Sequence, residues 1–492
     1  MKRLTLPELR AIWSGAGAIT LDAADYARID AAADTVAKLL QQGGPIYGVN
    51  TGFGLLANTR IGADKLEELQ RNLVLSHSCG VGPLLPERVV RLTLALKVLT
   101  LAQGRSGVRR IVIDTLLALL KAEAYPLIPS QGSVGASGDL APLAHLSCAL
   151  IGEGDVSVKG KITPARDALA TLGLKPIALG PKEGLALLNG TQVSTALALD
   201  ALFQIQDVFD AAITAGALSV DAIKGSDAPF DPRIHAARGH KGQIDVAARL
   251  RDLLKGSAIR ASHLIGDDRV QDPYSIRCQP QVMGACLDLI RNAAATLEIE
   301  ANSVTDNPLV FAEDNAILSG GNFHAEPVAF AADMLSMAAS EIASISERRI
   351  GVLIDTHLSR LPPFLVKEGG LNSGFMIAQV SAAALVSENK TLAHPASVDT
   401  IPTSANQEDH VSMATFAARK AGDIARNAAH VVAIELLAAA QGIDFHAPLK
   451  TSAPLQKAHE RIRSVAAFLD HDRAFAPDIA AVRGLIEQGA FS

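Results

Sequence analysis

The second half of the chain consists mostly of apolar segments with helical periodicity. Several of them exceed the usual helix length of about 8–20 residues, and prolines fall between the segments. Because such helices bury their apolar stripes against one another, the pattern predicts a helical bundle. The expected helices cover residues 192–223, 243–254, 281–300, 326–350, 374–392, 409–441 and 455–471.

The first 200 residues have shorter apolar segments joined by loops. A hairpin is expected over residues 156–163, where apolar and polar residues alternate around Lys159-Gly160-Lys161. We therefore predict a mainly α chain with an N-terminal domain of residues 1–200 and a long helical bundle of residues 201–492. Aromatic residues make up only 4% of the 492 residues, and abundant alanine suits closely packed helices.

Composition argues against several classes of protein. The net charge is −6 without a basic block, which argues against a nucleic-acid partner. The 4 cysteines contain no Cys-x2-Cys pair, so reduced thiols in a cytoplasmic protein are expected. The sequence has no uncharged apolar run of about 18 residues, and Glu8 and Arg10 interrupt the N-terminal apolar region. We therefore expect neither a membrane span nor a signal peptide.

A glycine-rich stretch at residues 131–143 has a backbone with few bulky side chains. It reads Gln-Gly-Ser-Val-Gly-Ala-Ser-Gly-Asp-Leu-Ala-Pro-Leu, and an apolar helical run begins after Asp139. Glycine permits tight turns and close backbone approaches, while a helix N-terminus favours negative charge. The stretch therefore predicts a tight turn that leads into a helix N-terminus.

Three interpretations of this turn compete. A stretch rich in Gly and Ser is most often a flexible loop. A hydrolase nucleophile elbow requires Gly-x-Ser-x-Gly, but Asp139 follows Ser137 two positions later. A phosphate loop of the type Gly-x4-Gly-Lys-Ser/Thr is absent from the sequence. The third interpretation comes from a family resemblance.

Residues 136–143, Ala-Ser-Gly-Asp-Leu-Ala-Pro-Leu, resemble the signature of the aromatic amino acid ammonia-lyases. In that family the glycine nitrogen attacks the alanine carbonyl, and loss of water from the ring and the serine leaves 4-methylidene-imidazol-5-one (MIO). The resemblance implies that Ala136, Ser137 and Gly138 form this electrophile. The substrate amine would add to it and become a better leaving group.

Further motifs resemble those of the family and follow in its order. They are residues 47–54 (Tyr-Gly-Val-Asn-Thr-Gly-Phe-Gly), 189–191 (Asn-Gly-Thr), 271–277 (Gln-Asp-Pro-Tyr-Ser-Ile-Arg), 320–324 (Gly-Gly-Asn-Phe-His) and 406–409 (Asn-Gln-Glu-Asp). The resemblance implies a fumarase/aspartase-like architecture, in which an MIO-bearing domain accompanies a long central helical bundle. It also implies a homotetramer whose active sites are shared between subunits.

One short segment separates substrates within the family, and here it reads Ser76-His77-Ser78. His followed by Ser, together with Glu408, resembles the histidine-specific members. The imidazole of a histidine substrate has two ring nitrogens, which a histidine and a carboxylate can bind. A phenyl ring would leave both groups unpaired, which is costly. The implied reaction is non-oxidative deamination of L-histidine to trans-urocanate and ammonia.

The resemblance also assigns the substrate-binding residues. Arg277 would bind the substrate carboxylate through two hydrogen bonds. Asn189 would hold that carboxylate or the ring carbonyl, and Gln271 and Phe323 would line and orient the site. No metal and no dissociable cofactor are expected. His235 and His240 do not have the spacing of a known zinc motif.

Three residues are candidates for the general base that removes the β-proton. Tyr47, on its glycine loop, is the first choice, followed by Tyr274 and then Glu408. A tyrosine must be ionised to act as a base, so positive potential nearby would have to lower its pKa. The position of Tyr47 on a loop would also suit a mobile lid.

Other interpretations of the same residues remain open. Alone, His77 would be a helix-end histidine, Glu408 a first-turn helix acid, Phe323 a core residue and Arg277 a surface ion pair. A tyrosine ammonia-lyase or an MIO-dependent aminomutase would share every motif except substrate selection. A catalytically silent helical assembly protein would keep the fold, although the reactive residues are all present. A serine hydrolase is the weakest alternative.

Overall fold

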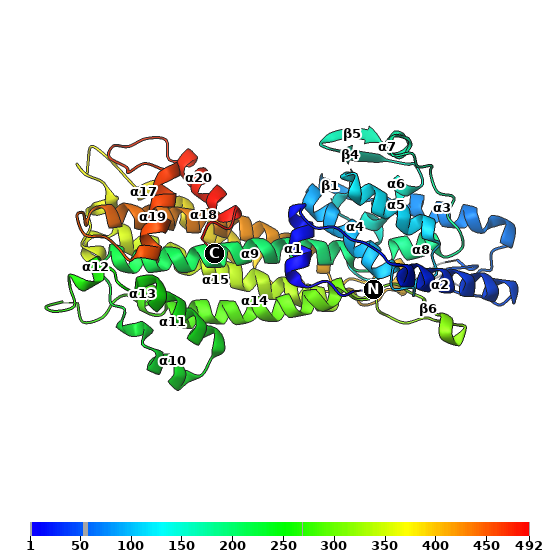
Figure 1. Cartoon of the computed structure of the whole chain (residues 1–492), viewed down its shortest axis with the longest axis horizontal. Helices are drawn as coiled ribbons and strands as arrows, with labels where there is room; N and C mark the ends of the chain where they lie inside the picture. The colour runs from blue at the N-terminus through cyan, green and yellow to red at the C-terminus, as the bar shows by residue number, and fades with distance from the viewer. Residues whose placement is uncertain (1, 53–57, 268, 492) are drawn as a thin grey trace. The chain divides into compact units, whose positions relative to one another are not determined.

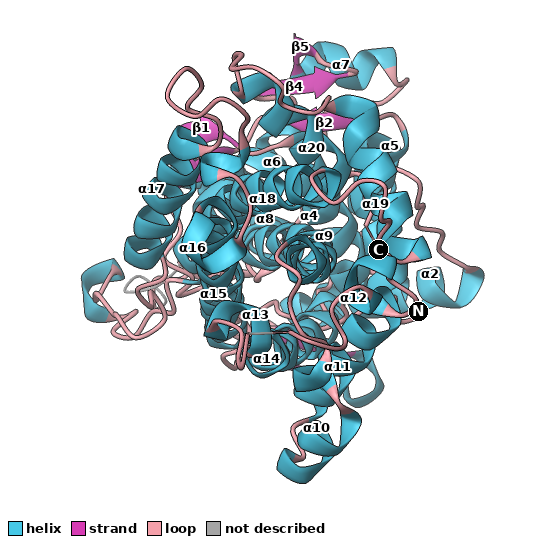
Figure 2. Cartoon of the chain, turned by 90° about the vertical axis from the view of Figure 1, so that its left-hand side faces the viewer, coloured by secondary structure: helices cyan, strands magenta, loops and turns pink. Residues whose placement is uncertain are grey.

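The structure is a computed structural model that describes residues 2–52, 58–267 and 269–491. Helices form most of the described chain and the strands are short (Figure 2), so the predicted mainly α fold is confirmed. Two compact units alternate along the chain. The first unit contains residues 1–200, 294–333 and 395–419, and the second contains residues 201–293, 334–394 and 420–492. The division into domains 1–200 and 201–492 stays a prediction.

The first unit contains short and medium helices, as its sequence predicts (Figure 1). Asp22 caps one of them, α2, and its side chain accepts a hydrogen bond from the Asp25 N–H at 2.8 Å. The helices that lie wholly in this unit are α1 (Leu6–Ser14), α2 (Ala23–Gln41), α3 (Leu66–His77), α4 (Glu87–Leu101), α5 (Arg110–Lys121), α6 (Leu140–Leu150), α7 (Ala165–Thr171) and α8 (Glu183–Leu188). Short 3-10 turns are η2 (Ala63–Lys65), η4 (Ala312–Asp314) and η6 (Ser404–Asn406).

All the named strands belong to the first unit and pair antiparallel. The predicted hairpin is confirmed as β4 (Asp155–Val158) and β5 (Lys161–Pro164), and β2 (Ala124–Pro126) adds to the outer edge of β4. β1 (Val81–Leu84) pairs with β3 (Pro129–Gln131), immediately before the glycine-rich turn. β6 (Leu309–Phe311) pairs with β7 (Ala316–Leu318).

Long helices begin after residue 191, as predicted. Each of the four longest has residues in both units: α9 (Gln192–Ala222), α14 (Gln279–Ala301), α15 (Glu326–Ile354) and α18 (Ala414–Asp444). The other helices of the second unit are η3 (Ala228–Phe230), α10 (Pro232–Arg238), α11 (Lys241–Leu254), α12 (Ala258–Ala261), α13 (Tyr274–Arg277), α16 (Thr356–Ser359), η5 (Pro363–Leu365), α17 (Met376–Leu392), α19 (Ala453–Val465) and α20 (Ala476–Glu487).

A buried carboxylate holds the long helices together within the second unit. Glu435 on α18 forms a salt bridge with Arg349 of α15, with an Nε–Oε1 distance of 2.5 Å, and both side chains are fully buried. Ser219 of α9 donates to Glu435 Oε1 at 2.8 Å, and Ser346 of α15 donates to Oε2 at 2.6 Å. The ion pair and these hydrogen bonds offset the cost of burying the charge inside an apolar helix interface.

Two predicted helix boundaries are wrong. The helix expected over 409–441 begins only at Ala414, because Met413 has φ 57 and Thr403 and Glu408 form a bridge that holds the preceding segment as a loop. Glu408 is therefore not a first-turn helix acid. The helix expected over 455–471 ends at Val465, because Ala466 is extended.

Helix α15 is long and apolar enough to cross a membrane by length and composition, although no membrane span was expected. In its most apolar window, 67% of the residues are buried within the protein. A buried core helix has these properties as well.

The first unit also buries charge. Lys182, immediately before α8, contacts Asp306 with an Nζ–Oδ2 distance of 2.8 Å, and both side chains are fully buried. Removal of one partner leaves the other charge buried and unpaired. Such a loss destabilises proteins much more than loss of an exposed pair.

We predict that Lys182→Met lowers the free energy of unfolding by about 3–5 kcal/mol. Denaturant and thermal unfolding followed by circular dichroism would measure this. The matched control is Lys2→Met, which removes an exposed lysine from the 2.6 Å pair with Glu8 and should leave unfolding unchanged. Equal midpoints for the two variants would contradict the prediction.

Candidate active site

A cavity of about 1360 Å³ in the first unit contains most of the predicted site residues. Tyr47, His77, Ser137, Asn189, Phe323 and Glu408 all line it. They come from six separate segments of the chain, one of which is the glycine-rich turn itself. Lysine and arginine do not occur among the described residues that line this cavity.

The glycine-rich turn is held by a close contact between two glycine backbones. Gly138 and Gly190 form a parallel bridge, and the Asp139 N–H donates to the Gly190 carbonyl at 2.8 Å. Gly138 has φ 73, and a Cβ atom placed on it would lie 2.3 Å from the Gly190 oxygen. Glycine is therefore required at position 138 both by conformation and by space.

Asp139 fixes the turn through a buried hydrogen-bond network. Its fully buried carboxylate accepts from the Ser194 N–H at 2.7 Å and from the Thr415 hydroxyl at 2.8 Å. The hydroxyls of Ser133 and Ser194 add further bonds, each at 3.0 Å. Burial raises the pKa of Asp139, while these donors act in the opposite direction. The network joins the turn to the starts of α9 and α18.

Ser137 projects from the turn into the cavity. Its hydroxyl donates to Glu408 Oε1 at 2.5 Å, and the Thr403 hydroxyl donates to Glu408 Oε2 at 2.6 Å. Both oxygens of this carboxylate are therefore engaged within the chain. Asn189 Nδ2 donates to the Ser137 carbonyl at 2.9 Å, which also holds the backbone of the turn.

The arrangement fits an MIO group formed from Ala136, Ser137 and Gly138. The glycine lacks the side chain that would block its amide, and the serine hydroxyl lies beside a proton acceptor. The Oδ1 atom of Asn189 is buried and has no hydrogen-bond partner among the described residues. A buried amide oxygen without a hydrogen-bond donor costs free energy, so we expect a polar group beside it in the mature protein.

Lys97 lies beneath the Asn189 loop and is fully buried. Its ammonium donates to the carbonyls of Asn189 at 2.8 Å and Ala186 at 3.2 Å, at the C-terminal end of α8. Burial lowers the pKa of Lys97 to about 7, although the nearby carboxylates of Asp306 and Asp139 oppose the shift. Lys97 thus fixes the backbone from which the Asn189 side chain reaches the turn.

His77 ends α3 at the wall of the cavity. Its Nδ1 lies 2.8 Å from the Leu73 carbonyl oxygen. A carbonyl only accepts hydrogen bonds, so Nδ1 carries the proton and Nε2 is the acceptor in the neutral ring. Burial lowers the pKa of His77, against the opposing effects of Leu73 and Glu408. The ring is therefore mainly neutral near pH 7.

Tyr47 lies on a loop whose neighbouring residues are held by hydrogen bonds. Asn50 Nδ2 donates to the Gly44 carbonyl at 2.9 Å, and the Gly52 N–H donates to the Thr59 carbonyl at 2.9 Å. The tyrosine motif was predicted over residues 47–54, of which Phe53 and Gly54 lie outside the described residues. Tyr47 itself lines the cavity.

Three predicted site residues belong to the second unit. Gln271 is exposed, Tyr274 is 73% exposed, and Arg277 is partly buried. Tyr274 and Arg277 lie on α13, with the guanidinium carbon 4.7 Å from the centre of the tyrosine ring. Arg277 Nε is buried and has no hydrogen-bond partner among the described residues. None of these three is among the residues that line the first-unit cavity.

Two contributions were not predicted from the sequence. Lys97 supports the Asn189 loop, and the Asp139 carboxylate connects the turn to two long helices. The sequence does carry a signal for the role of Lys97. This lysine lies within the apolar run Leu-Thr-Leu-Ala-Leu-Lys-Val-Leu-Thr-Leu, and lysines are rarely buried unless they have partners. For Asp139 the sequence indicates only a position directly before a helix.

Comparison with known proteins extends over nearly the whole chain. A model of the family described as aromatic amino acid lyase matches residues 4–464. The histidine ammonia-lyase of Burkholderia pseudomallei (strain 668) is 62% identical over 490 residues, which cover 100% of this chain and 96% of that protein. The solved histidine ammonia-lyase from Trypanosoma cruzi is 44% identical with a TM-score of 0.92, covering 99% of this chain and 92% of that chain. The tyrosine aminomutase from Streptomyces globisporus is 37% identical with a TM-score of 0.94, covering 100% and 96%.

The lowered pKa of Lys97 predicts a pH-dependent stability. In the unfolded chain a lysine has a pKa of about 10.4, so between that value and about 7 the folded lysine binds fewer protons than the unfolded one. Stability contributed by this group is therefore present at high pH and is lost as the pH falls towards 7. We expect the difference in unfolding free energy, wild type minus Lys97→Met, to be larger at about pH 9 than at about pH 7. Denaturant unfolding at both values measures it, and a constant difference would contradict the assignment.

Proposed function

The chain belongs to the aromatic amino acid lyase family, and we propose that it is a histidine ammonia-lyase that deaminates L-histidine to trans-urocanate and ammonia. The observation that carries this proposal is that Ser137, His77 and Glu408 line one cavity. Histidine ammonia-lyases at 62% and 44% identity support the same choice of substrate.

His77 and Glu408 would recognise the substrate imidazole from two directions. The neutral His77 ring offers Nε2 as an acceptor, because Nδ1 is bound to the Leu73 carbonyl. Glu408 offers a carboxylate oxygen on the same cavity wall as Ser137. A neutral imidazole carries one N–H, and an imidazolium carries two. The neutral form can therefore donate to one of these two acceptors and the imidazolium to both, whereas a phenyl ring can donate to neither.

The MIO group would form from Ala136, Ser137 and Gly138, and once formed it supplies an electrophile that takes up the substrate amine. The protein's own residues prepare its place. The Gly138–Gly190 contact fixes the turn, and Asn189 donates to the Ser137 carbonyl. The N-terminus of α6, which begins at Leu140 directly after the turn, would favour the developing negative charge through the helix dipole.

Tyr47 is the favoured general base. It lines the cavity together with Ser137, and backbone hydrogen bonds hold the residues next to it in its loop. Tyr274 remains second, since it is largely exposed on the second unit. Glu408 remains third, because one of its oxygens accepts a hydrogen bond from Thr403 and the other is assigned to the substrate imidazole.

A homotetramer would complete the site. The substrate carboxylate needs a cation, and the described lining of the first-unit cavity contains neither lysine nor arginine. Arg277 has a buried Nε atom without a hydrogen-bond partner in the described part of the chain, and its guanidinium stacks on Tyr274. We propose that α13 of a partner subunit supplies this arginine and tyrosine, with Gln271 beside them. Phe323 would contact the substrate from the wall of the cavity.

The chain would work in the reducing environment of the cytoplasm, without nucleic acid or a membrane as partner. Its cysteines are all free thiols, and its charge of −6 includes no basic block. No metal or dissociable cofactor is needed for the proposed chemistry.

The substrate assignment predicts a selective loss in His77→Leu. Wild type should produce urocanate from L-histidine and no product from L-tyrosine or L-phenylalanine. The variant should lose about 10–100-fold in kcat/KM for histidine, because a hydrogen bond to the ring is removed. Ultraviolet assays with the three amino acids, in parallel, measure this.

The matched control for this test is His430→Leu. His430 Nδ1 also lies 2.8 Å from a carbonyl one helical turn earlier, that of Arg426, but it lies on α18 in the second unit. It should keep full activity. Coumarate or cinnamate from the wild type would point to a tyrosine or phenylalanine lyase, and a β-amino acid would point to an aminomutase. Equal losses of activity in both variants would contradict a ring-binding role for His77.

The role of Tyr47 can be separated from MIO formation. Tyr47→Phe should lower kcat by about 10²–10⁴-fold, as expected for loss of a general base, while intact mass still shows the loss of two waters. Ser137→Ala should abolish both the mass loss and the activity. Tyr26→Phe, which removes a hydroxyl 2.7 Å from Asp114, is the control. Near-normal turnover of Tyr47→Phe would exclude it as the base.

A further inference from the structure

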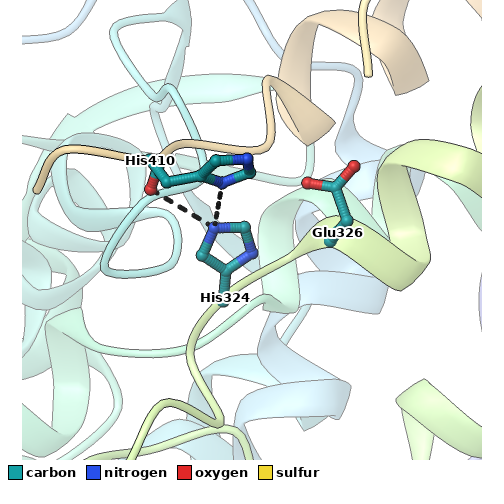
Figure 3. Close-up of side chains that lie close together, drawn as sticks. All are labelled: His324, Glu326 and His410. Atoms are coloured by element: carbon teal, nitrogen blue, oxygen red, sulfur yellow. Dashed lines mark hydrogen bonds between the residues drawn. The ribbon is translucent and has the colours of Figure 1, made fainter. Parts of the chain in front are cut away.

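Two histidines and a glutamate form a cluster at the edge of the cavity (Figure 3). His324 precedes α15, Glu326 is its first residue, and His410 lies on the loop before α18. One ligand atom from each residue can be chosen so that all of these atoms lie within 4.8 Å of one another. His324 and His410 also line the cavity. The proposed reaction uses none of the three.

The distance between the two rings suits a shared metal ion. His324 Nε2 lies 3.3 Å from His410 Nδ1. Two imidazole nitrogens bound to one tetrahedral zinc ion, each at about 2.0–2.1 Å, are separated by about 3.3–3.4 Å. The ring planes are tilted by 34°, so the rings are not stacked face to face.

Glu326 provides a third ligand, and one of its carboxylate oxygens is available to bind a cation. Its Oε2 atom is buried and has no hydrogen-bond partner among the described residues. Figure 3 shows the carboxylate pointing towards the two imidazoles. A buried carboxylate oxygen without a partner is costly, and a cation between it and the rings would remove that cost.

The backbone holds the ligands in place on both sides. The His324 N–H donates to the Gly321 carbonyl at 3.0 Å, and the Val411 N–H donates to the Thr400 hydroxyl at 2.9 Å. The site is therefore built on segments with fixed geometry, although His324 and His410 lie 86 positions apart. No spacing rule for zinc motifs would find it from the sequence.

We propose that His324, Glu326 and His410 bind a divalent transition-metal ion of the zinc class, with a further coordination position open towards the cavity. Two imidazoles and one carboxylate favour zinc or a similar ion over magnesium or calcium, which prefer oxygen ligands. The ion would be held by these three side chains at the edge of the cavity, and it takes no part in the proposed deamination.

A direct hydrogen bond between the histidines is the competing explanation. His324 Nε2 lies 3.3 Å from the His410 carbonyl as well as from its Nδ1. One proton on Nε2 can serve only one of these acceptors, and both distances are long for a strong bond. A hydrogen-bonded pair would bind no metal, so metal binding separates the two explanations.

The test is calorimetric titration of the full-length, chelator-treated protein with Zn²⁺, without histidine in the buffer. Wild type should bind one ion per chain at this site. His324→Ala and His410→Ala should each weaken that binding at least about tenfold, as loss of metal-site contacts does. Co²⁺ should give a visible absorption band in wild type that both variants lose.

Two further variants make the test decisive. Glu326→Gln keeps the volume of the side chain and should also weaken binding, even if an alanine variant fails to fold. His471→Ala removes an exposed histidine 3.5 Å from Asp470 and should leave the affinity unchanged. Absence of one-to-one binding in wild type, or binding that survives all three cluster substitutions, would overturn the proposal.

Discussion

The contact between the Gly138 and Gly190 backbones determines the geometry of the candidate active site. It brings the glycine-rich turn against the loop that carries Asn189, at a distance that a Cβ atom on Gly138 would prevent. Asp139 then enters the interior, where its carboxylate binds groups at the starts of two long helices. Because each of these elements is fixed by the next, Ser137 is held at the cavity surface and cannot retreat into the core.

Buried charged residues lie close to the same turn. Lys97 and the Lys182–Asp306 pair are fully buried beneath or beside the Asn189 loop. Buried charges cost folding free energy unless they are paired, so they are weak evidence for stability. They do, however, restrict the loop to one arrangement, because any shift would break hydrogen bonds in a low-dielectric interior. An active site whose groups must be positioned before the substrate arrives benefits from that restriction.

Local periodicity predicted most of the helices and the hairpin, because each depends on residues near one another in the chain. Family resemblance selected His77, Ser137 and Glu408, which the fold places on one cavity. The start of α18 could not be predicted, since it depends on the left-handed Met413 and on pairing between Thr403 and Glu408. Nor could a linear pattern reveal that residues 294–333 and 395–419 return to the first unit, because that return depends on contacts between distant segments.

The hydrogen bond from Ser137 to Glu408 has a consequence for the timing of activity. While the serine keeps its hydroxyl, one oxygen of Glu408 is occupied by an alcohol tethered to the same fold. A free ligand competes poorly with a tethered one, whose effective concentration is in the millimolar range or above. On the proposed chemistry, MIO formation removes that hydroxyl as water. The Glu408 oxygen can then accept a hydrogen bond from the substrate. On that proposal, an immature chain would lack both the electrophile and a free Glu408 oxygen, so the first turnover would follow maturation.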